Sequence, residues 1–428
     1  NVIEEVIADG ENYVKKYWED DLTDYNQENY VERFEVLEYW GMIDVDMLLD
    51  QEVDITKESK VNKEKIGIFG DYDVDGATST ALLGNYFSEL NLKYEIYIPD
   101  RKKEGYGPSI ESFKKLIKKG VKVIFTVDCG TLSFDAINYA KKNDIDVMVI
   151  DHHQSEVTLP DAFSIINPNR LDDKSNLQYL CAAGVTFMFL VSINRELRSN
   201  NWFNKNKINE PNLINFLDLV SLGTVCDVVP LMDLNRAFVY QGLKVASKRY
   251  NLGLKTLVDY SKIKKKLSTY EVGYVLGPKI NAGGRIGKSE LGYNLLTTNN
   301  AETAYLISSE LESLNLKRKD IEKKIVEEAI GISEKNNDEP IVFLSKNNWH
   351  EGLIGIVASR LKDHFNKPSF IISQKGDDCK GSARSIFGFD VGMAITKCKQ
   401  LNIITKGGGH PMAGGFSLKS DKLEIFKS

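Results

Sequence analysis

Carboxylate and imidazole side chains follow three short apolar segments of the chain, residues 66–69, 121–127 and 147–150. The residues placed in this way are Asp71, Asp73, Asp75, Asp128, His152 and His153. Carboxylates at alternate positions repel one another, so a bound cation has to offset that cost. Each motif taken alone also fits a plainer interpretation, because acidic loops are often solvated turns and a lone Asp often caps a helix. Their coincidence predicts a divalent-cation site, with Mn²⁺ or Mg²⁺ favoured by the mixed oxygen and imidazole ligands.

A seventh candidate, Asp227, lies in the apolar run 223–230. A buried carboxylate is costly unless it is paired or binds a metal, although Asp227 could also cap the next turn. Together the seven side chains suffice for two cations bridged by one carboxylate. Two cations ~3.5–4 Å apart can activate water and stabilise both oxygens of an in-line displacement at phosphorus. The sequence therefore predicts a catalytic centre for phosphoester hydrolysis.

The elements that would position these residues follow an α/β pattern. Apolar strands at 66–69, 93–98, 121–127 and 147–150 alternate with helices, which is typical of a parallel sheet with crossover helices. Ligands of such sheets bind beyond the carboxyl ends of the strands. Residues 181–298 are mainly helical, residues 301–332 form one helix of ~45 Å, and a second, smaller α/β domain follows. The expected division is an acidic extension at 1–62, a catalytic domain at 63–300, a connecting helix at 301–335 and a substrate-binding domain at 336–428.

The net charge of −6 is unevenly distributed. Residues 1–62 hold 18 acidic and 5 basic side chains, a net −13, which leaves +7 on residues 63–428. The acidic total therefore does not exclude a nucleic-acid partner for the part of the chain that carries the motifs. Hydrophobic residues make up 42% and charged residues 27%, as in globular proteins, and no signal peptide or membrane span is visible. Five cysteines without paired spacing predict a reducing, cytoplasmic location.

The order and spacing of these motifs resemble the DHH phosphoesterase superfamily, and within it the RecJ-type exonucleases. Asp151-His152-His153 gives the superfamily motif, and Phe69 stands where small-substrate members carry a histidine. Three further stretches match RecJ-type members: 223–231, 281–285 and 349–360. Gly407–His410 with Ala413–Phe416 resembles the DHH-associated domain.

The resemblance implies a role for each residue of the centre. Asp128 would bridge two cations, and Asp73 would bind one of them with Asp71 nearby. The ligands of the other cation would be Asp75, His152 and Asp227. His153 would orient the scissile phosphate or support the leaving group.

The resemblance also implies the substrate-binding residues. Arg101 and Arg285 would contact phosphates, and Ser382 with Arg384 would hold the terminal 5′-phosphate. The active-site side of the second domain would be closed by Gly408, Gly409 and His410. Arginine suits bidentate phosphate contacts, and glycines let backbone amides approach a phosphate. As plainer alternatives, the glycine run could be a simple turn and Arg285 a surface residue. The lysine run 264–266 could be a solvated helix face or a DNA contact.

The activity implied is a metal-dependent exonuclease that degrades single-stranded DNA from the 5′ end to 5′-mononucleotides, in DNA repair and recombination. The strand would thread between the two α/β domains, activated water would attack phosphorus, and the 3′-oxygen would leave. A single-strand-binding protein or a helicase is the expected protein partner, and no membrane is expected. The alternatives are a phosphodiesterase for nanoRNA or cyclic dinucleotides and an inactive scaffold that binds replication proteins. RecJ-type proteins commonly add an oligonucleotide-binding barrel, for which the sequence to Ser428 has no room, so reduced affinity or a truncated chain is expected.

Overall fold

The computed structural model describes residues 65–101, 103–336 and 339–428, and the expected acidic extension at 1–62 lies outside these ranges. The first domain contains a five-stranded, wholly parallel sheet in the order β2-β1-β3-β4-β5. Its strands are β1 (Lys65–Gly70), β2 (Tyr94–Tyr97), β3 (Val121–Val127), β4 (Asp146–Ile150) and β5 (Ser164–Ile166). The short strand β5 was not predicted from the sequence. The chain order reverses at β1 and β3, and ligands of open α/β sheets bind at such a reversal.

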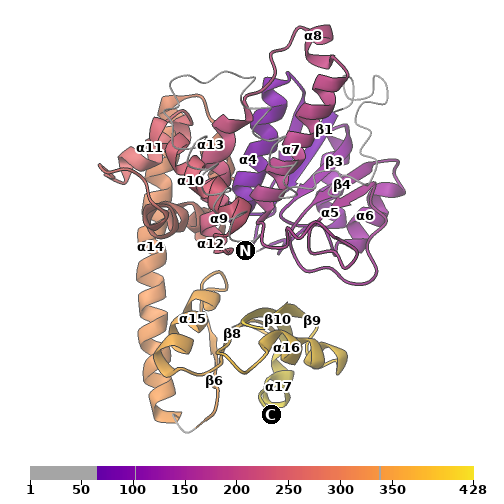
Figure 1. Cartoon of the computed structure of the whole chain (residues 1–428). Helices are drawn as coiled ribbons and strands as arrows, with labels where there is room; N and C mark the ends of the chain where they lie inside the picture. The colour runs from indigo at the N-terminus through magenta and orange to yellow at the C-terminus, as the bar shows by residue number, and fades with distance from the viewer. Residues whose placement is uncertain (1–64, 102, 337–338) are drawn as a thin grey trace, which may run out of the picture.

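Helices cover both faces of this sheet (Figure 1). Alternate residues of each strand enter two separate cores, as Ile68 and Phe69 of β1 show. The core that contains Phe69 is closed by α5 (Ile110–Lys118) and α6 (Phe134–Lys141). The core that contains Ile68 is closed by α4 (Val74–Glu89), α7 (Ala182–Ser199) and α9 (Leu217–Cys226).

The remainder of the first domain is helical, as the sequence predicted. Its further elements are α8 (Trp202–Asn206), the 3₁₀ turn η2 (Leu213–Phe216), α10 (Asp233–Lys248), α11 (Leu252–Tyr260), the π-helix η3 (Glu271–Leu276), α12 (Gly277–Ile286) and α13 (Leu291–Thr297). The long helix α14 (Ala301–Ser333) then runs from this domain to the second one, packing on α11 and α12 at one end and on α15 (Ile354–Phe365) at the other (Figure 1). At 1.5 Å per residue its 33 residues span about 50 Å.

The second domain has a mixed five-stranded sheet in the order β6-β7-β8-β10-β9. Its strands are β6 (Val342–Asn347), β7 (Ser369–Lys375), β8 (Asp378–Arg384), β9 (Lys406–His410) and β10 (Ala413–Lys419), and its remaining elements are α16 (Val391–Gln400), α17 (Leu423–Lys427) and the short turns η4 (Glu334–Asn336) and η5 (Ser420–Lys422). The predicted class, a parallel-sheet domain joined by a long helix to a smaller α/β domain, is confirmed. No helix among the described residues is long and apolar enough to cross a bilayer.

Candidate active site

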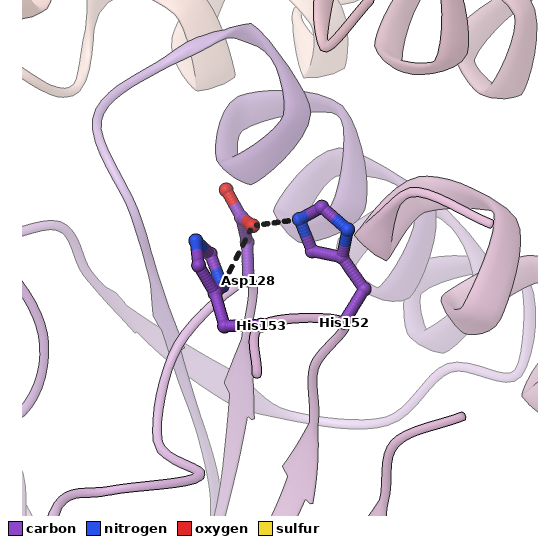
Figure 2. A group of neighbouring side chains, drawn as sticks. All are labelled: Asp128, His152 and His153. Carbon is purple, nitrogen blue, oxygen red and sulfur yellow. Dashed lines mark ion pairs between the residues drawn. The ribbon is translucent and has the colours of Figure 1, made fainter. Parts of the chain in front are cut away.

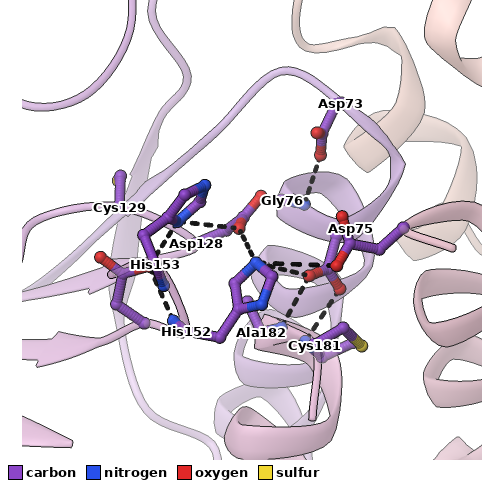
Figure 3. Close-up of polar contacts among 12 residues, drawn as sticks. Asp73, Asp75, Gly76, Asp128, Cys129, His152, His153, Cys181 and Ala182 are labelled. Carbon is purple, nitrogen blue, oxygen red and sulfur yellow. Dashed lines mark hydrogen bonds and ion pairs between the residues drawn. The ribbon is translucent and has the colours of Figure 1, made fainter. Parts of the chain in front are cut away.

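The turn after β1 carries three of the predicted acids to the start of α4. Asp73 is the N-cap of this helix, and one of its carboxylate oxygens accepts a hydrogen bond from Gly76 N at 2.9 Å. Asp75 lies in the first helical turn and accepts from the backbone amides of Ala182 (2.6 Å) and Ala183 (2.9 Å). These amides begin α7, so the positive end of that helix faces the Asp75 carboxylate. The start of α7 thereby fixes the direction of Asp75 (Figure 3).

Asp128, His152 and Asp227 meet Asp75 at the carboxyl end of the sheet. Nε2 of His152 lies 3.4 Å from Oδ1 of Asp128, 3.7 Å from Oδ2 of Asp227 and 3.8 Å from Oδ2 of Asp75. Figure 2 shows Asp128 between the rings of His152 and His153, whose Nδ1 lies 3.9 Å from the same oxygen. One imidazole nitrogen thus faces carboxylates delivered by β3, α4 and α9.

Asp227 is held at the end of α9 by two uncommon backbone features. Gly223 lies one turn earlier, where a Cβ atom would come within 2.7 Å of both Asp75 Oδ1 and the Cβ of Ala183. Val228, the next residue after Asp227, has φ of +62°, which a β-branched residue rarely adopts. Such strain is typical of functional sites. The glycine lets α9 approach α4 and α7, and the turn at Val228 ends the helix beside them.

Asp151 orients the two histidines. Its carboxylate is buried and accepts from the hydroxyl of Thr131 at 2.7 Å and the backbone amide of His152 at 2.8 Å. Its Oδ1 also lies 2.8 Å from Nδ1 of His153. Asp151 is the first residue of the sequence motif, and no separate role was predicted for it. The structure places it one layer behind the cluster, where it holds the side chain of His153 and the backbone of His152.

Tyr106 and two asparagines were missed from the sequence. The Tyr106 hydroxyl donates to the backbone oxygen of Asp128 at 2.9 Å and lies 3.1 Å from Nδ1 of His153. Asn167 and Asn169, after β5, donate to the backbone oxygens of His153 (2.8 Å) and His152 (2.6 Å). Asn167, like the predicted ligands, follows an apolar strand, but β5 has only three residues, too few to be recognised from the sequence pattern. Tyr106 lies in an irregular loop that has no such pattern.

The carboxylates raise one another's pKa because they are buried together. Burial, then the charges of Asp73 and Asp75, raises the pKa of Asp128 well above its usual range. Burial, followed by the same two charges, raises the pKa of Asp227 to about 8. Oδ1 of Asp71 is also buried, with no hydrogen-bond partner among the described residues. Excess negative charge and a buried oxygen without a partner are what a cation would satisfy.

Three sets of ligand atoms lie within 4.8 Å of one another in the described chain: Asp71/Asp73/Asp128, Asp75/His152/Asp227 and Asp128/His152/His153. Oxygen and imidazole donors without thiolate suit Mn²⁺ and Mg²⁺. The first two sets divide the cluster between two cations as predicted, and Asp128 is near both. The residues present therefore fit two divalent cations.

Three predicted phosphate ligands form a positive group next to this cluster. Burial, then the neighbouring charge of Arg101, lowers the pKa of Arg285 to about 10, and Arg384 adds to the effect. The pKa of Arg384 is lowered by burial and by Arg101 in the same way. Arg285 is not simply a surface residue, because its guanidinium donates to the backbone oxygen of Gly352 at 3.2 Å. This contact joins the first domain to the second.

Ser382 and Arg384 lie on β8 beneath the N-terminal turn of α15. A Cβ atom at Gly355 would come within 3.1 Å of Ser382 Oγ and 3.4 Å of an Arg384 nitrogen. The predicted glycine run is an edge strand and not a turn: in β9, Gly408 pairs with Gly415, which pairs with Ser382. Gly408 and Gly409 are exposed. His410 is placed by its register alone, next to Ala413, which pairs with Arg384.

Comparison with known proteins finds two family domains in the chain. Residues 65–224 match the DHH family N-terminal domain, and residues 338–428 match the DHHA1 domain. The single-stranded-DNA-specific exonuclease RecJ of Salmonella typhimurium is 38% identical over 392 residues, which cover 89% of this chain and 68% of that protein. The chain belongs to the RecJ family. RecJ of Escherichia coli is 37% identical over 374 residues, covering 85% of this chain and 65% of that protein.

Solved RecJ structures agree with the fold and the expected cations. The Mn²⁺ complex of RecJ from Thermus thermophilus matches with a TM-score of 0.74 at 26% identity, covering 90% of this chain and 53% of that one. The Mg²⁺ complex from the same organism gives 0.64 at 25% identity, with 90% and 50% covered. The chain thus spans about half the length of the Thermus protein. The prediction of Mn²⁺ or Mg²⁺ as cofactor is confirmed for the family.

Proposed function

We propose that the protein is a divalent-cation-dependent exonuclease that removes 5′-mononucleotides from the 5′ end of single-stranded DNA, in DNA repair and recombination. The main support is the cluster around His152 Nε2, in which carboxylates from β3, α4 and α9 lie within 3.8 Å of this nitrogen. RecJ relatives whose length this chain covers to about two thirds are named single-stranded-DNA-specific exonucleases.

The roles of the cluster follow from its contacts. Asp71, Asp73 and Asp128 would hold one cation, and Asp75, His152 and Asp227 the other, with Asp128 near both. Bound cations would supply activation of water and neutralisation of phosphate charge. Asp75 keeps its direction without them, because its oxygens accept from the amides of Ala182 and Ala183. Asp75 would therefore bind a cation with little rearrangement.

His153 is the residue suited to the phosphate itself. Burial alone would lower the pKa of His153, but the hydrogen bond and charge of Asp151 outweigh it and raise the pKa to about 9. The imidazolium, held by Asp151 and Tyr106, offers positive charge at the edge of the cluster. It would bind a phosphate oxygen and stabilise the departing 3′-oxygen.

Exonuclease character is assigned to Ser382 and Arg384. The N-terminal turn of α15 approaches both side chains at Gly355, and helix N-termini favour anions. Arg101 and Arg285 add positive charge, visible in the lowered pKa values of Arg285 and Arg384. A terminal phosphate carries more charge than an internal one, so this group would select strand ends.

The alternatives fit the described residues less well. Phe69, at the position where small-substrate members carry histidine, is fully buried and packs on Tyr97 and Phe113. It cannot be replaced by a ligand without opening that core. An inactive scaffold would have no reason to keep seven side chains in one charged cluster, since burying them without cations is costly.

The deciding experiment is a digest with Mn²⁺ of end-labelled single-stranded and double-stranded DNA, single-stranded RNA and the dinucleotide pApA. The proposal expects mononucleotides from the 5′ end of single-stranded DNA only. Faster hydrolysis of pApA than of long strands would favour the small-substrate phosphodiesterase. Absence of hydrolysis of every substrate, with Mn²⁺ bound, would favour the scaffold.

Cellular context is proposed from the same observations. All five cysteines are free thiols, which supports a reducing, cytoplasmic location. A single-strand-binding protein or a helicase stays a prediction as protein partner. Both would deliver single-stranded ends to the centre.

A further inference from the structure

Two exposed tyrosines stack on each other on the surface of the first domain. Tyr270 is 61% and Tyr274 is 74% exposed, and their ring centroids are 5.1 Å apart at an interplanar angle of 30°. Large aromatic side chains are usually buried or bonded to a partner, so a stacked pair in solvent is uncommon. The pair offers an aromatic surface to a ligand with a flat face.

The pair is attached to the catalytic cluster through α9. Tyr274 lies in the π-helix η3, a rare element that often marks functional sites. A Cβ atom at Gly273 would lie 3.4 Å from the side chain of Val225, and Sγ of Cys226 lies 3.7 Å from the backbone oxygen of Val272. Cys226 immediately precedes the predicted ligand Asp227. The element that carries Tyr274 therefore packs directly on the end of α9 that carries a predicted cation ligand.

Three consecutive lysines, residues 264–266, precede the pair in the chain. Lys265 forms an ion pair with Glu271 at 2.8 Å, and Glu271 also accepts a hydrogen bond from Ser268 N at 3.0 Å, so this lysine serves the local structure. Lys264 and Lys266 are exposed and have no carboxylate partner in the described part of the chain. Aromatic rings beside unpaired lysines form the combination by which proteins bind single strands without sequence preference.

We propose that Tyr270 and Tyr274, with Lys264 and Lys266, bind the single strand on the 3′ side of the cleaved bond. A base would stack on the tyrosine pair, and the lysines would contact phosphates. This inference rests on the proposed function for the polarity of the strand. Ser382 and Arg384 belong to the second domain and the tyrosines to the first. A strand whose 5′ end is held by the second domain would continue, beyond the cluster, over the first domain that carries the tyrosines. Substrate length would therefore affect affinity.

The test is binding of 5′-phosphorylated oligo(dT) of 4, 8, 16 and 24 nucleotides to the full chain, measured by fluorescence anisotropy with Ca²⁺ in place of Mn²⁺. Substituting both tyrosines by alanine should raise Kd for the 24-mer at least about fivefold, since stacking on one ring is worth about 1 kcal/mol or more. Substituting both by phenylalanine keeps the rings and should leave Kd within about twofold. Tyr250→Ala, which removes another exposed tyrosine, is the matched control.

The contribution of the lysines is tested separately, by the salt dependence of binding. Lys264→Gln and Lys266→Gln should each lower the slope of log K against log salt by about 0.7, the value for one phosphate contact of a single strand. Lys265→Gln, which breaks the pair with Glu271, should leave that slope unchanged.

The inference is overturned if the double alanine variant binds the 24-mer like the wild type. It is also overturned if Kd rises equally for the 4-mer and the 24-mer, because the effect would then arise at the cluster. Binding is measured without cleavage, so it separates the two proposals. A wild type that binds long strands through the tyrosines but digests none would refute the proposed activity alone.

Discussion

Nδ1 of His153 lies 2.8 Å from Oδ1 of Asp151, a carboxylate that also accepts from Thr131 and from the backbone of His152. Burial works against the ionised form of Asp151, but these hydrogen bonds keep its pKa below the usual range. The negative charge in turn keeps a proton on His153, whose pKa is raised to about 9. The pair thus places one positive charge beside a group of acids at neutral pH.

Asp151→Asn should shift the pH dependence of cleavage. The substitution removes the charge that raises the pKa of His153, so the imidazolium is lost at lower pH. Activity that needs the imidazolium falls as pH rises through this pKa, and the alkaline limb of kcat/KM should move down by about 1–2 pH units. The profile is measured between pH 6 and 10 at saturating Mn²⁺, with Asp161→Asn as an exposed control. An unmoved alkaline limb would show that Asp151 does not set the charge of His153.

The fold and the first layer of the site could be predicted because each ligand follows an apolar strand or helix. Asp71, Asp128 and His152 share one edge of the sheet by topology alone, and the sequence shows each strand that carries them. The second layer could not be predicted in this way. Tyr106 comes from an irregular loop, and its contact with His153 depends on the tertiary path of that loop. Asn167 follows a strand of three residues, too short to stand out by periodicity.

The glycines of the second domain show a different limit of prediction from the sequence. A run of glycines such as the one that contains Gly408 and Gly409 is typical of turns, yet these residues form an edge strand. The neighbouring Gly407 faces Ile395 and Ile404, where a Cβ atom would come within 2.9 Å of both side chains. Close packing of Gly407 against α16 therefore favours the strand over a turn. The sequence pattern cannot reveal this packing, because it depends on the tertiary structure.

Asp128→Asn should stabilise the cation-free protein and weaken its response to Mn²⁺. The folded-state pKa of Asp128 is raised, so the stability that its carboxyl contributes is present at low pH and is lost as pH rises through that pKa. At neutral pH an asparagine side chain at position 128 carries no charge that the neighbouring carboxylates could repel. The variant should therefore have a higher midpoint of thermal unfolding in EDTA than the wild type. The rise in that midpoint on adding Mn²⁺ should shrink, and cleavage should fall at least ~100-fold. Asp320→Asn on α14 is the control, and equal Mn²⁺ responses would contradict the assignment.

Arg384→Ala should weaken selection of the 5′-phosphate. The side chain lies beside Ser382 and the start of α15 and is not one of the predicted cation ligands. KM for 5′-phosphorylated strands should therefore rise roughly tenfold, while KM for 5′-hydroxyl strands changes little. Both substrates are compared at one salt concentration, with Lys375→Ala as an exposed cation control. Equal losses on the two kinds of end would refute the pocket.

Asp218→Asn should raise stability above neutral pH. Asp218 is buried in α9, its Oδ2 has no hydrogen-bond partner among the described residues, and burial raises its pKa to about 7. The stability tied to its protonated form is complete below the unfolded pKa of ~4 and is lost by about pH 7. The variant should therefore gain up to about 4 kcal/mol over the wild type at pH 8 and nothing at pH 4. Thermal unfolding at both pH values checks this, and a gain of equal size at each would exclude the titration of Asp218 as its cause.

The 33-residue helix α14 would fix the distance between the two domains during the proposed reaction. It is one continuous helix packed on both domains, and the hydrogen bond from Arg285 to Gly352 adds a second link between them. In the proposed reaction the first domain would hold the cations and the second domain would hold the terminal phosphate. The distance between these two sites would then set how many nucleotides are removed at each step, independent of the base sequence of the strand.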